Sequence, residues 1–342
     1  MLLSPLNKRI SDWFVRQFGR GTPEVAPRGR GPSIHVIIMD GTMSTLSPGR
    51  ETNAGVTYKM LSQMGGDVSV YYEHGLQWSH WRRVGDVLMG RGINRQIRRA
   101  YGYLASRYQP GDQVFLMGFS RGAYAVRSLA GVVDMVGLLR REDATERNVR
   151  SAYRHYKNAP NSDAAKHFRT AFCHDDAKIE MIGVWDTVKS LGLNAPILWR
   201  LSVAKHAFHS AALGRSVRNG YHALAHDETR VVYSPVMWKT DPAWNGHMEQ
   251  MWFRGAHGDV GGELGGQQQV RPLSNIPLVW ILEKAESHGL PMPQDWRDGF
   301  PRDATAPARG TWAGYSRIFI NRKSRIIGAD PSESLHPSMA EG

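Results

Sequence analysis

The sequence lacks several features that would place it in a familiar class. Its single cysteine, Cys173, excludes an internal disulfide framework. No apolar run approaches the roughly 18 residues that a membrane span needs. The mildly apolar residues 1–6 are followed by Lys8 and Arg9 without a small-residue cleavage site, so no signal peptide is indicated. We therefore expect a cytoplasmic protein as synthesised, for which export without a signal peptide stays open.

The charge of the chain is one-sided. Lysine and arginine number 43 against 31 aspartate and glutamate residues, giving a net charge of +12. Such a charge favours an anionic membrane surface or nucleic acid, although it also simply keeps a protein soluble. No zinc-finger, KH or RRM signature is present, and aromatic residues form no stripe with basic ones. Nucleic acid is therefore not expected as a partner, and the oligomeric state stays undetermined.

Residues 1–33 differ from the rest of the chain. Five apolar residues share one stripe at helical spacing, and a segment rich in glycine and proline follows. The stripe consists of Leu6, Ile10, Trp13, Phe14 and Phe18. This pattern predicts a peripheral amphipathic segment, which either packs on its own domain or an oligomer, or contacts a membrane. Residues 34–342 are long enough for one domain with one large core.

Strand and helix patterns alternate along this domain. Short apolar runs predict strands, and apolar residues at helical spacing predict helices between them. The predicted strands are 34–39, 68–75, 113–117, 178–185 and 249–256, and the predicted helices are 93–108, 121–139 and 276–289. This alternation predicts an α/β fold, a doubly wound and mostly parallel sheet with helices on both faces.

One glycine-rich motif joins a predicted strand to a predicted helix. Gly118-Phe119-Ser120-Arg121-Gly122 has the Gly-x-Ser-x-Gly pattern. Between a buried strand and a helix it is typical of a nucleophile elbow, in which glycines allow a tight turn and the serine projects from the carboxyl edge of the sheet. The alternative is a glycine-rich helix start that Ser120 merely caps.

A serine needs a base to remove its proton. His257 follows a predicted strand in the glycine-rich "GAHGDVGGE" and is our candidate, whereas four other histidines lie in regions predicted as helix or loop. These are His206, His209, His222 and His226.

The acid that orients the histidine has three candidates. Asp186 ends the strand after the elbow helix, at the edge where Ser120 is expected. It could instead form a turn or cap a helix. Asp227 is the alternative acid, and Asp259 is too close to His257 in sequence to reach its far ring nitrogen.

The stretch "HVIIMDGT" resembles the start of an aspartyl phosphatase, but Ile38 occupies the attacking position. An acyl-transfer site instead needs two backbone N–H groups for the oxyanion. One belongs to Arg121, after the nucleophile, and Gly41 or Thr42 can supply the other. Asp40 would then brace this turn.

Two readings compete with a serine hydrolase. His257, Asp259 and Glu263 lie on one loop and could bind a metal, but no second histidine is placed beside them. A binding module on the same fold would not need serine, histidine and aspartate together. We therefore expect a cofactor-free hydrolase without a metal.

Four blocks in order resemble the catalytic domain of type VI secretion phospholipase effectors, an α/β-hydrolase family. They are "DGT" (40–42), "GFSRGAYAVRSLAG" (118–131), "GVWDTVKSLG" (183–192) and "GAHGDVGGE" (255–263). The resemblance implies Ser120 as nucleophile, His257 as base, an aspartate as its partner, and a lipid ester, most of all a phospholipid, as substrate.

The sequence also departs from that family. Met43-Ser44 stand where the family has Trp-Asn, Gly258 replaces a serine, and Glu263-Leu264 replace Gly-Tyr. These changes line the expected site, so a soluble short-chain ester remains the alternative substrate.

Overall fold

The computed structural model describes residues 33–66, 68–75, 91–188, 212–312 and 321–340. The predicted amphipathic segment 1–33 lies outside these residues, apart from Ser33. Seven strands form one sheet in the order β2-β1-β3-β4-β5-β6-β7, and every neighbouring pair is parallel. The strands are β1 (Ile34–Met39), β2 (Val68–Glu73), β3 (Gln113–Phe119), β4 (Ile179–Trp185), β5 (Val217–Ala225), β6 (His247–Phe253) and β7 (Glu333–Leu335).

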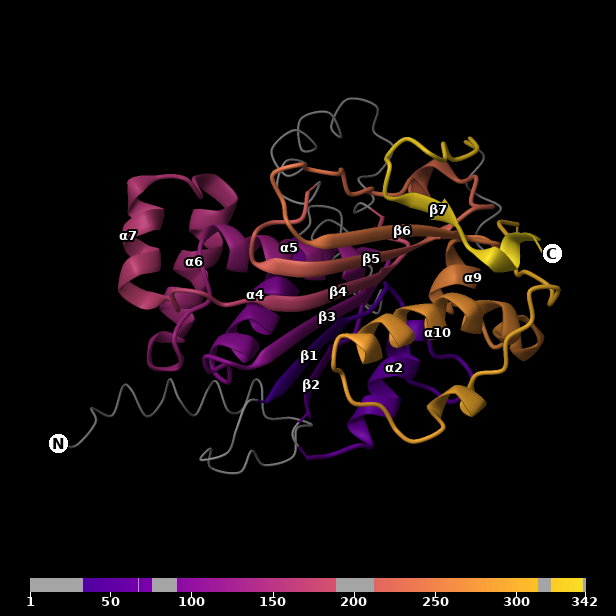
Figure 1. Cartoon of the computed structure of the whole chain (residues 1–342), viewed down its shortest axis with the longest axis horizontal. Helices are drawn as coiled ribbons and strands as arrows, with labels where there is room; N and C mark the ends of the chain where they lie inside the picture. The colour runs from indigo at the N-terminus through magenta and orange to yellow at the C-terminus, as the bar shows by residue number, and fades with distance from the viewer. Residues whose placement is uncertain (1–32, 67, 76–90, 189–211, 313–320, 341–342) are drawn as a thin grey trace.

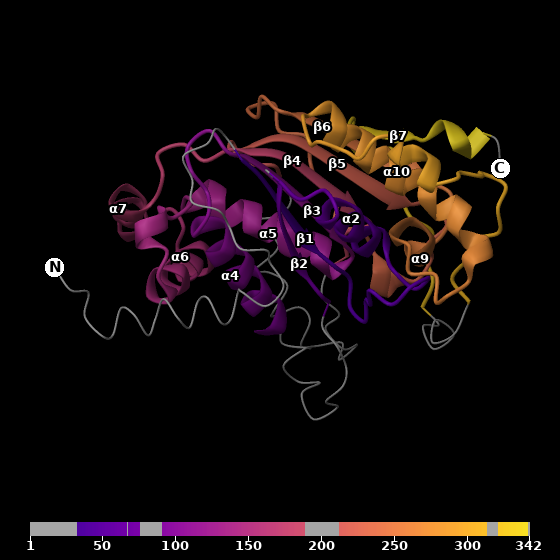
Figure 2. The ribbon, with the colours of Figure 1, turned by 90° about the horizontal axis from the view of Figure 1, so that it is seen from below.

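Helices cover both faces of this sheet (Figures 1 and 2). One face carries α4 (Arg91–Ala105) and α5 (Arg121–Met135), with α6 (Glu146–Asn158) and α7 (Asp163–Phe172) beyond them. The other carries α2 (Asn53–Ser62), α9 (His257–Gly261) and α10 (Arg271–Ser287). The alternation of side chains along a strand explains the two cores, because Ile37 and Met39 of β1 enter one, and Val36 and Ile38 the other. The predicted doubly wound α/β architecture is confirmed.

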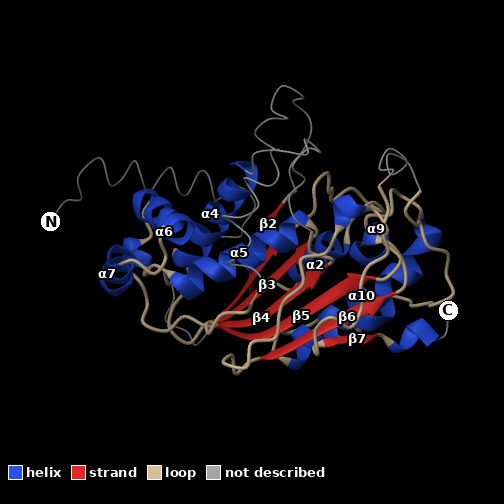
Figure 3. Cartoon of the chain, turned by 90° about the horizontal axis from the view of Figure 1, so that it is seen from above, coloured by secondary structure: helices blue, strands red, loops and turns tan. Residues whose placement is uncertain are grey.

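All strands run in the same direction, so the sheet has one carboxyl edge. Figure 3 shows the strands pointing toward α9 and away from α6 and α7. The turns that follow β1, β3, β4, β5 and β6 therefore meet at one end of the molecule, which is where ligands bind in open α/β sheets. Within the described part of the chain, no helix combines the length and apolarity needed to cross a bilayer.

Several elements differ from the sequence prediction. The predicted helix 121–139 ends at Met135, because Gly137 has a φ of 102° and donates its N–H back to Val132 O and Val133 O. No helix or strand is predicted from the sequence at α2, α6, α7, β5 or β7. The prediction of a helix or loop at His222 is wrong, since His222 lies in β5 and is fully buried. Burial lowers its pKa to about 3, so the ring is neutral and accepts from Thr187 N at 3.0 Å.

Candidate active site

The turn between β3 and α5 has a strained backbone at Ser120. Ser120 adopts a φ of 58° and a ψ of −121°, a conformation that L-residues rarely occupy. Glycines make the turn possible. A Cβ at Gly122 would lie 2.1 Å from Met39 O, and one at Gly118 would lie 2.8 Å from Ala123 N. The chain thus tolerates only glycine on both sides of this serine.

The Ser120 hydroxyl is not used as a helix cap. Its side chain makes no capping bond to α5, which argues against the alternative derived from the sequence. Instead, Oγ lies 2.9 Å from His257 Nε2. Since α5 begins at Arg121, the Arg121 N–H belongs to the first turn, whose donors lack partners within the helix. The positive end of the helix dipole therefore faces the serine.

His257 is the first residue of α9, just beyond β6. The residue is 2% exposed, and its ring packs against those of Phe119 and Tyr233 at centroid distances of 4.8 and 4.6 Å. The His257 N–H donates to Glu228 Oε2 at 3.1 Å, which fixes the start of the helix. Nδ1 lies 2.6 Å from Asp186 Oδ2. The imidazole is thus held with one nitrogen on the serine and the other on a carboxylate.

Asp186 follows β4 and is completely buried, with a φ of 38°. Its Oδ1 accepts from Ala225 N at 3.0 Å, and both oxygens pair with the Arg325 guanidinium. Burial alone would raise the pKa of this carboxyl. Arg325 and His257 outweigh burial and hold the pKa well below its usual range. Asp186 is therefore a carboxylate throughout the ordinary pH range.

The rival aspartates do not reach His257 Nδ1. Asp227 has its Oδ1 2.6 Å from His226 Nδ1, and its Oδ2 accepts from Gly255 N at 2.7 Å. Asp259 accepts backbone N–H groups of its own loop and of the segment opposite, at 2.7 to 3.1 Å from Ala256, Arg309 and Gly310. Both shape the loops around the site. Among the described residues, no three His, Cys, Asp or Glu side chains cluster as a metal site would require.

The turn after β1 lies beside the serine. A Cβ at Gly41 would be 3.4 Å from Ser120 Cβ. Asp40 braces this turn by accepting from Gly41 N at 2.6 Å, Thr52 Oγ1 at 2.7 Å and Tyr72 Oη at 2.6 Å. Burial outweighs these bonds and raises the Asp40 pKa to about 6. The Gly41 N–H therefore donates to Asp40. Of the two N–H groups expected to bind an oxyanion, this favours that of Thr42.

Most of the chain matches one family of known proteins. Residues 34–284 match the family described as the catalytic domain of Tle1-like type VI secretion phospholipase effectors. The chain belongs to this family. The matched region holds Ser120, Asp186 and His257, together with the turn after β1.

This Tle1-like domain has relatives of greater length. It is 29% identical over 226 residues to YEL023C, an uncharacterised protein of Saccharomyces cerevisiae, covering 54% of this chain and 33% of the yeast protein. A solved Tle1 effector, bound to the VgrG spike of a type VI secretion system, is 15% identical with a TM-score of 0.36, covering 71% of this chain and 54% of that one. An uncharacterised Pseudomonas aeruginosa protein is 17% identical with a TM-score of 0.45, at 88% and 52% coverage. The chain thus spans a third to about half of these proteins.

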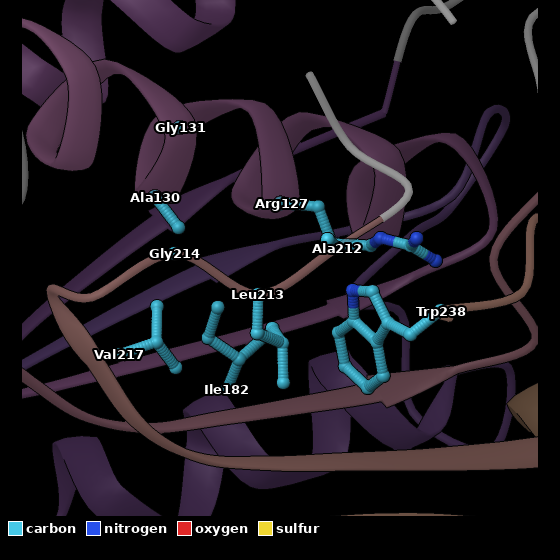
Figure 4. A pocket seen from close by; sticks show the side chains of 9 residues that line it. All are labelled: Arg127, Ala130, Gly131, Ile182, Ala212, Leu213, Gly214, Val217 and Trp238. Atoms are coloured by element: carbon cyan, nitrogen blue, oxygen red, sulfur yellow. The ribbon is translucent and has the colours of Figure 1, made fainter. Parts of the chain in front are cut away.

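A buried arginine of α5 anchors a neighbouring loop of the Tle1-like domain. Arg127 donates to Val236 O and Met237 O, and its guanidinium lies 4.6 Å from the Trp238 ring centroid (Figure 4). Burial lowers its pKa to about 9. The cavity beside it measures about 10 Å³, which is too small for an ester. Arg127 therefore anchors the segment that follows Tyr233, whose ring packs on His257.

Three residues of the site had no signal in the sequence. Arg325 lies in the irregular tail, Tyr233 in a 3₁₀ helix (Val231–Tyr233), and Gly75 just beyond β2. A Cβ at Gly75 would lie 1.6 Å from Gly41 O, so only glycine lets β2 end beside the turn. Nothing in the sequence distinguishes Gly75 among the 36 glycines of the chain.

Proposed function

We propose that this Tle1-like domain is a serine ester hydrolase that cleaves a lipid ester, with a phospholipid as the leading substrate class. The hydrogen-bonded series Ser120 Oγ, His257 Nε2, His257 Nδ1 and Asp186 Oδ2 supports the proposal, with distances of 2.9 and 2.6 Å. A nucleophile bonded to a base, and a base bonded to an orienting acid, is the arrangement that acyl transfer requires.

In the proposed reaction, Ser120 Oγ attacks the acyl carbonyl carbon while His257 Nε2 takes the hydroxyl proton. Asp186 accepts the Nδ1 hydrogen bond and stabilises the imidazolium that forms. The carbonyl oxygen becomes an oxyanion, which needs N–H donors. We assign these to Arg121 and Thr42, because the Gly41 N–H already donates to Asp40.

The tetrahedral intermediate then collapses. The bond to the leaving alcohol breaks, His257 returns the proton to the alcohol oxygen, and an acyl-enzyme on Ser120 remains. Water attacks the acyl carbon with His257 again as base, and release of the carboxylic acid restores the serine. Each step uses groups of the chain and water, so the proposal requires no cofactor.

The distribution of exposed apolar side chains favours a lipid over a soluble ester. Within the described ranges six large apolar residues are exposed, and five of them lie on segments that contact the site or flank it. These five are Met43, Val231, Trp312, Ile326 and Ile327. Met43 follows the oxyanion turn, Val231 begins the 3₁₀ helix of Tyr233, and Ile326 and Ile327 follow Arg325. Exposed apolar side chains on these segments suit contact with a lipid surface.

The test compares wild type with Ser120→Ala on aryl esters of graded chain length and on mixed phospholipid vesicles, with chelator present. Hydrolysis by wild type alone, rising with chain length and on vesicles, supports the proposal. Preference for short soluble esters favours the short-chain esterase. Equal rates in both proteins would refute the Ser120 assignment, and a wild type inactive on every ester favours a binding module.

A further inference from the structure

Asp186 has a second charged partner besides His257. Arg325 donates from Nη1 to Asp186 Oδ1 at 2.5 Å and from Nη2 to Oδ2 at 2.9 Å. Both side chains are buried, with exposures of 4% and 0%. A planar guanidinium that bonds both oxygens fixes the plane of the carboxylate as well as its position. Arg325 thus also fixes the orientation of Oδ2, the Asp186 oxygen that bonds His257.

Arg325 is itself fixed by two backbone carbonyls. Nη1 donates to Ala225 O at 2.8 Å, and Nη2 donates to Tyr233 O at 2.6 Å. Ala225 ends β5, and Tyr233 packs its ring on His257. One guanidinium therefore joins the carboxylate, the end of a central strand and the residue that covers the imidazole. A displacement of Arg325 would move all three.

The charge of Arg325 also acts on His257. Because His257 Nδ1 and Arg325 Nη2 bond the same Asp186 oxygen, at 2.6 and 2.9 Å, they lie within about 5.5 Å of each other. At an effective dielectric constant near 20, a unit charge at this distance shifts the protonation equilibrium of a titratable group by about two pH units. Arg325 therefore places a positive charge close to the imidazole, on the same Asp186 oxygen that bonds it.

The other charges around His257 are largely paired with each other. Glu228, which accepts from the His257 N–H, bonds Arg230 through both oxygens. Arg230 also lies over the Tyr233 ring at 4.2 Å. On the α5 side, Arg121 interacts electrostatically with Tyr233 and Glu263. Arg325 therefore faces the imidazole through the one carboxylate that orients it.

We propose that Arg325 is a positioning residue of the Ser120–His257–Asp186 site. It fixes the Asp186 carboxylate in the plane that orients His257, and it balances the carboxylate charge so that His257 remains able to accept the Ser120 proton at a lower pH. The inference rests on the proposed hydrolase function and extends it from three residues to four.

The test measures kcat/KM against pH on a soluble aryl ester for wild type, Arg325→Met and Arg325→Lys. Arg325→Met removes the charge, and we expect the acidic midpoint of the profile to rise by one to two units, with a lower kcat and little change in KM. Arg325→Lys keeps the charge and loses the paired geometry, so its midpoint stays near that of wild type while kcat falls.

Arg322→Met is the matched control. Arg322 lies in the same segment and donates to Thr229 Oγ1 and Thr311 O, and its guanidinium lies 3.9 Å from the Trp312 ring centroid. No hydrogen bond joins it to Asp186 among the described contacts. If loosening this segment were sufficient, Arg322→Met would shift the midpoint as Arg325→Met does, and that result overturns the proposal.

The outcomes separate this proposal from the function on which it rests. A wild-type midpoint in folded Arg325→Met overturns the role of Arg325, while an inactive Ser120→Ala still supports the hydrolase. An active Ser120→Ala overturns both. If Arg325→Met does not fold, Arg325→Lys decides: an unchanged midpoint with a lower kcat supports the proposal, and a rise of one unit or more overturns it.

Discussion

Asp186→Asn tests two roles of the buried carboxylate, one in the proposed catalysis and one in the stability of the fold. The substitution keeps the size of the side chain and removes its charge. Arg325 then remains 4% exposed, with two carbonyls as partners and no counter-charge. Removing one partner of a buried ion pair costs about 3–5 kcal/mol of unfolding free energy. In the proposed mechanism kcat/KM also falls by about 10⁴, because asparagine does not select the right tautomer.

The double variant Asp186→Asn/Arg325→Met distinguishes the two effects. It removes the unpaired cation together with the carboxylate, so the free energy of unfolding returns to within about 1–2 kcal/mol of wild type. Activity stays lost, since nothing orients His257. The assays are urea unfolding followed by the fluorescence of the 11 tryptophans and kcat/KM on a soluble ester.

The pH of the stability assay follows from the direction of the Asp186 shift. Its pKa is lowered in the folded protein, so the ion pair stabilises the fold fully above the unfolded value near 4. This stabilisation is lost only as the pH falls toward the folded value. Measurements at pH 7–8 therefore capture all of it. Asp186→Asn within about 1 kcal/mol of wild type, or a double variant as unstable as the single one, would refute this reasoning.

Three further predictions concern the turns around the site. Gly75→Ala should lower kcat/KM by about 10²–10³, because its Cβ would displace Gly41 O and with it the turn that supplies an oxyanion donor. Gly299→Ala is the control, since Gly299 has open space around it. Equal activity of the two variants would contradict this prediction. Asp40 has a raised pKa of about 6, so the stabilisation that its protonated form provides is complete below about pH 4 and is lost as the pH rises through 6. Asp40→Asn should remove about 2 kcal/mol of this pH dependence in urea unfolding between pH 4.5 and 7.5, and a curve parallel to that of wild type would contradict it. Asp227→Asn should retain most of the wild-type ester hydrolysis, whereas a loss as large as that of Asp186→Asn would make Asp227 the acid.

The fold and the central residues of the site could be predicted because their signals are local. A buried strand followed by glycine and a polar residue marks a carboxyl edge, and parallel strands bring all such edges together. Ser120 and His257 lie beside such glycines, and Asp186 follows its buried strand directly. The prediction does not require the order of the strands, since their parallel direction alone brings these side chains to one end of the sheet.

Arg325 could not be predicted in this way. It is 139 residues beyond Asp186 in an irregular segment, and only the folded chain brings the two together. The same limit explains β5, where Asn219, Gly220 and His222 interrupt the apolar pattern of a central strand. His222 is buried there because its ring accepts a backbone N–H. A polar residue that finds its partner only in the fold reads as exposed in the sequence.

Two buried aspartates at the carboxyl edge of the sheet have different roles. Asp186 is kept ionised by a guanidinium that comes from the distant tail, which suits a group that must stabilise an imidazolium. Within the described ranges Asp40 has three hydrogen bonds and no cationic partner, and burial raises its pKa to about 6. The Asp-Gly-Thr turn suggests an attacking aspartate, but its aspartate, Asp40, accepts hydrogen bonds that brace the turn. Because their surroundings push the two pKa values in opposite directions, Asp186 keeps its charge behind His257 when the pH falls below 6, whereas Asp40 becomes protonated.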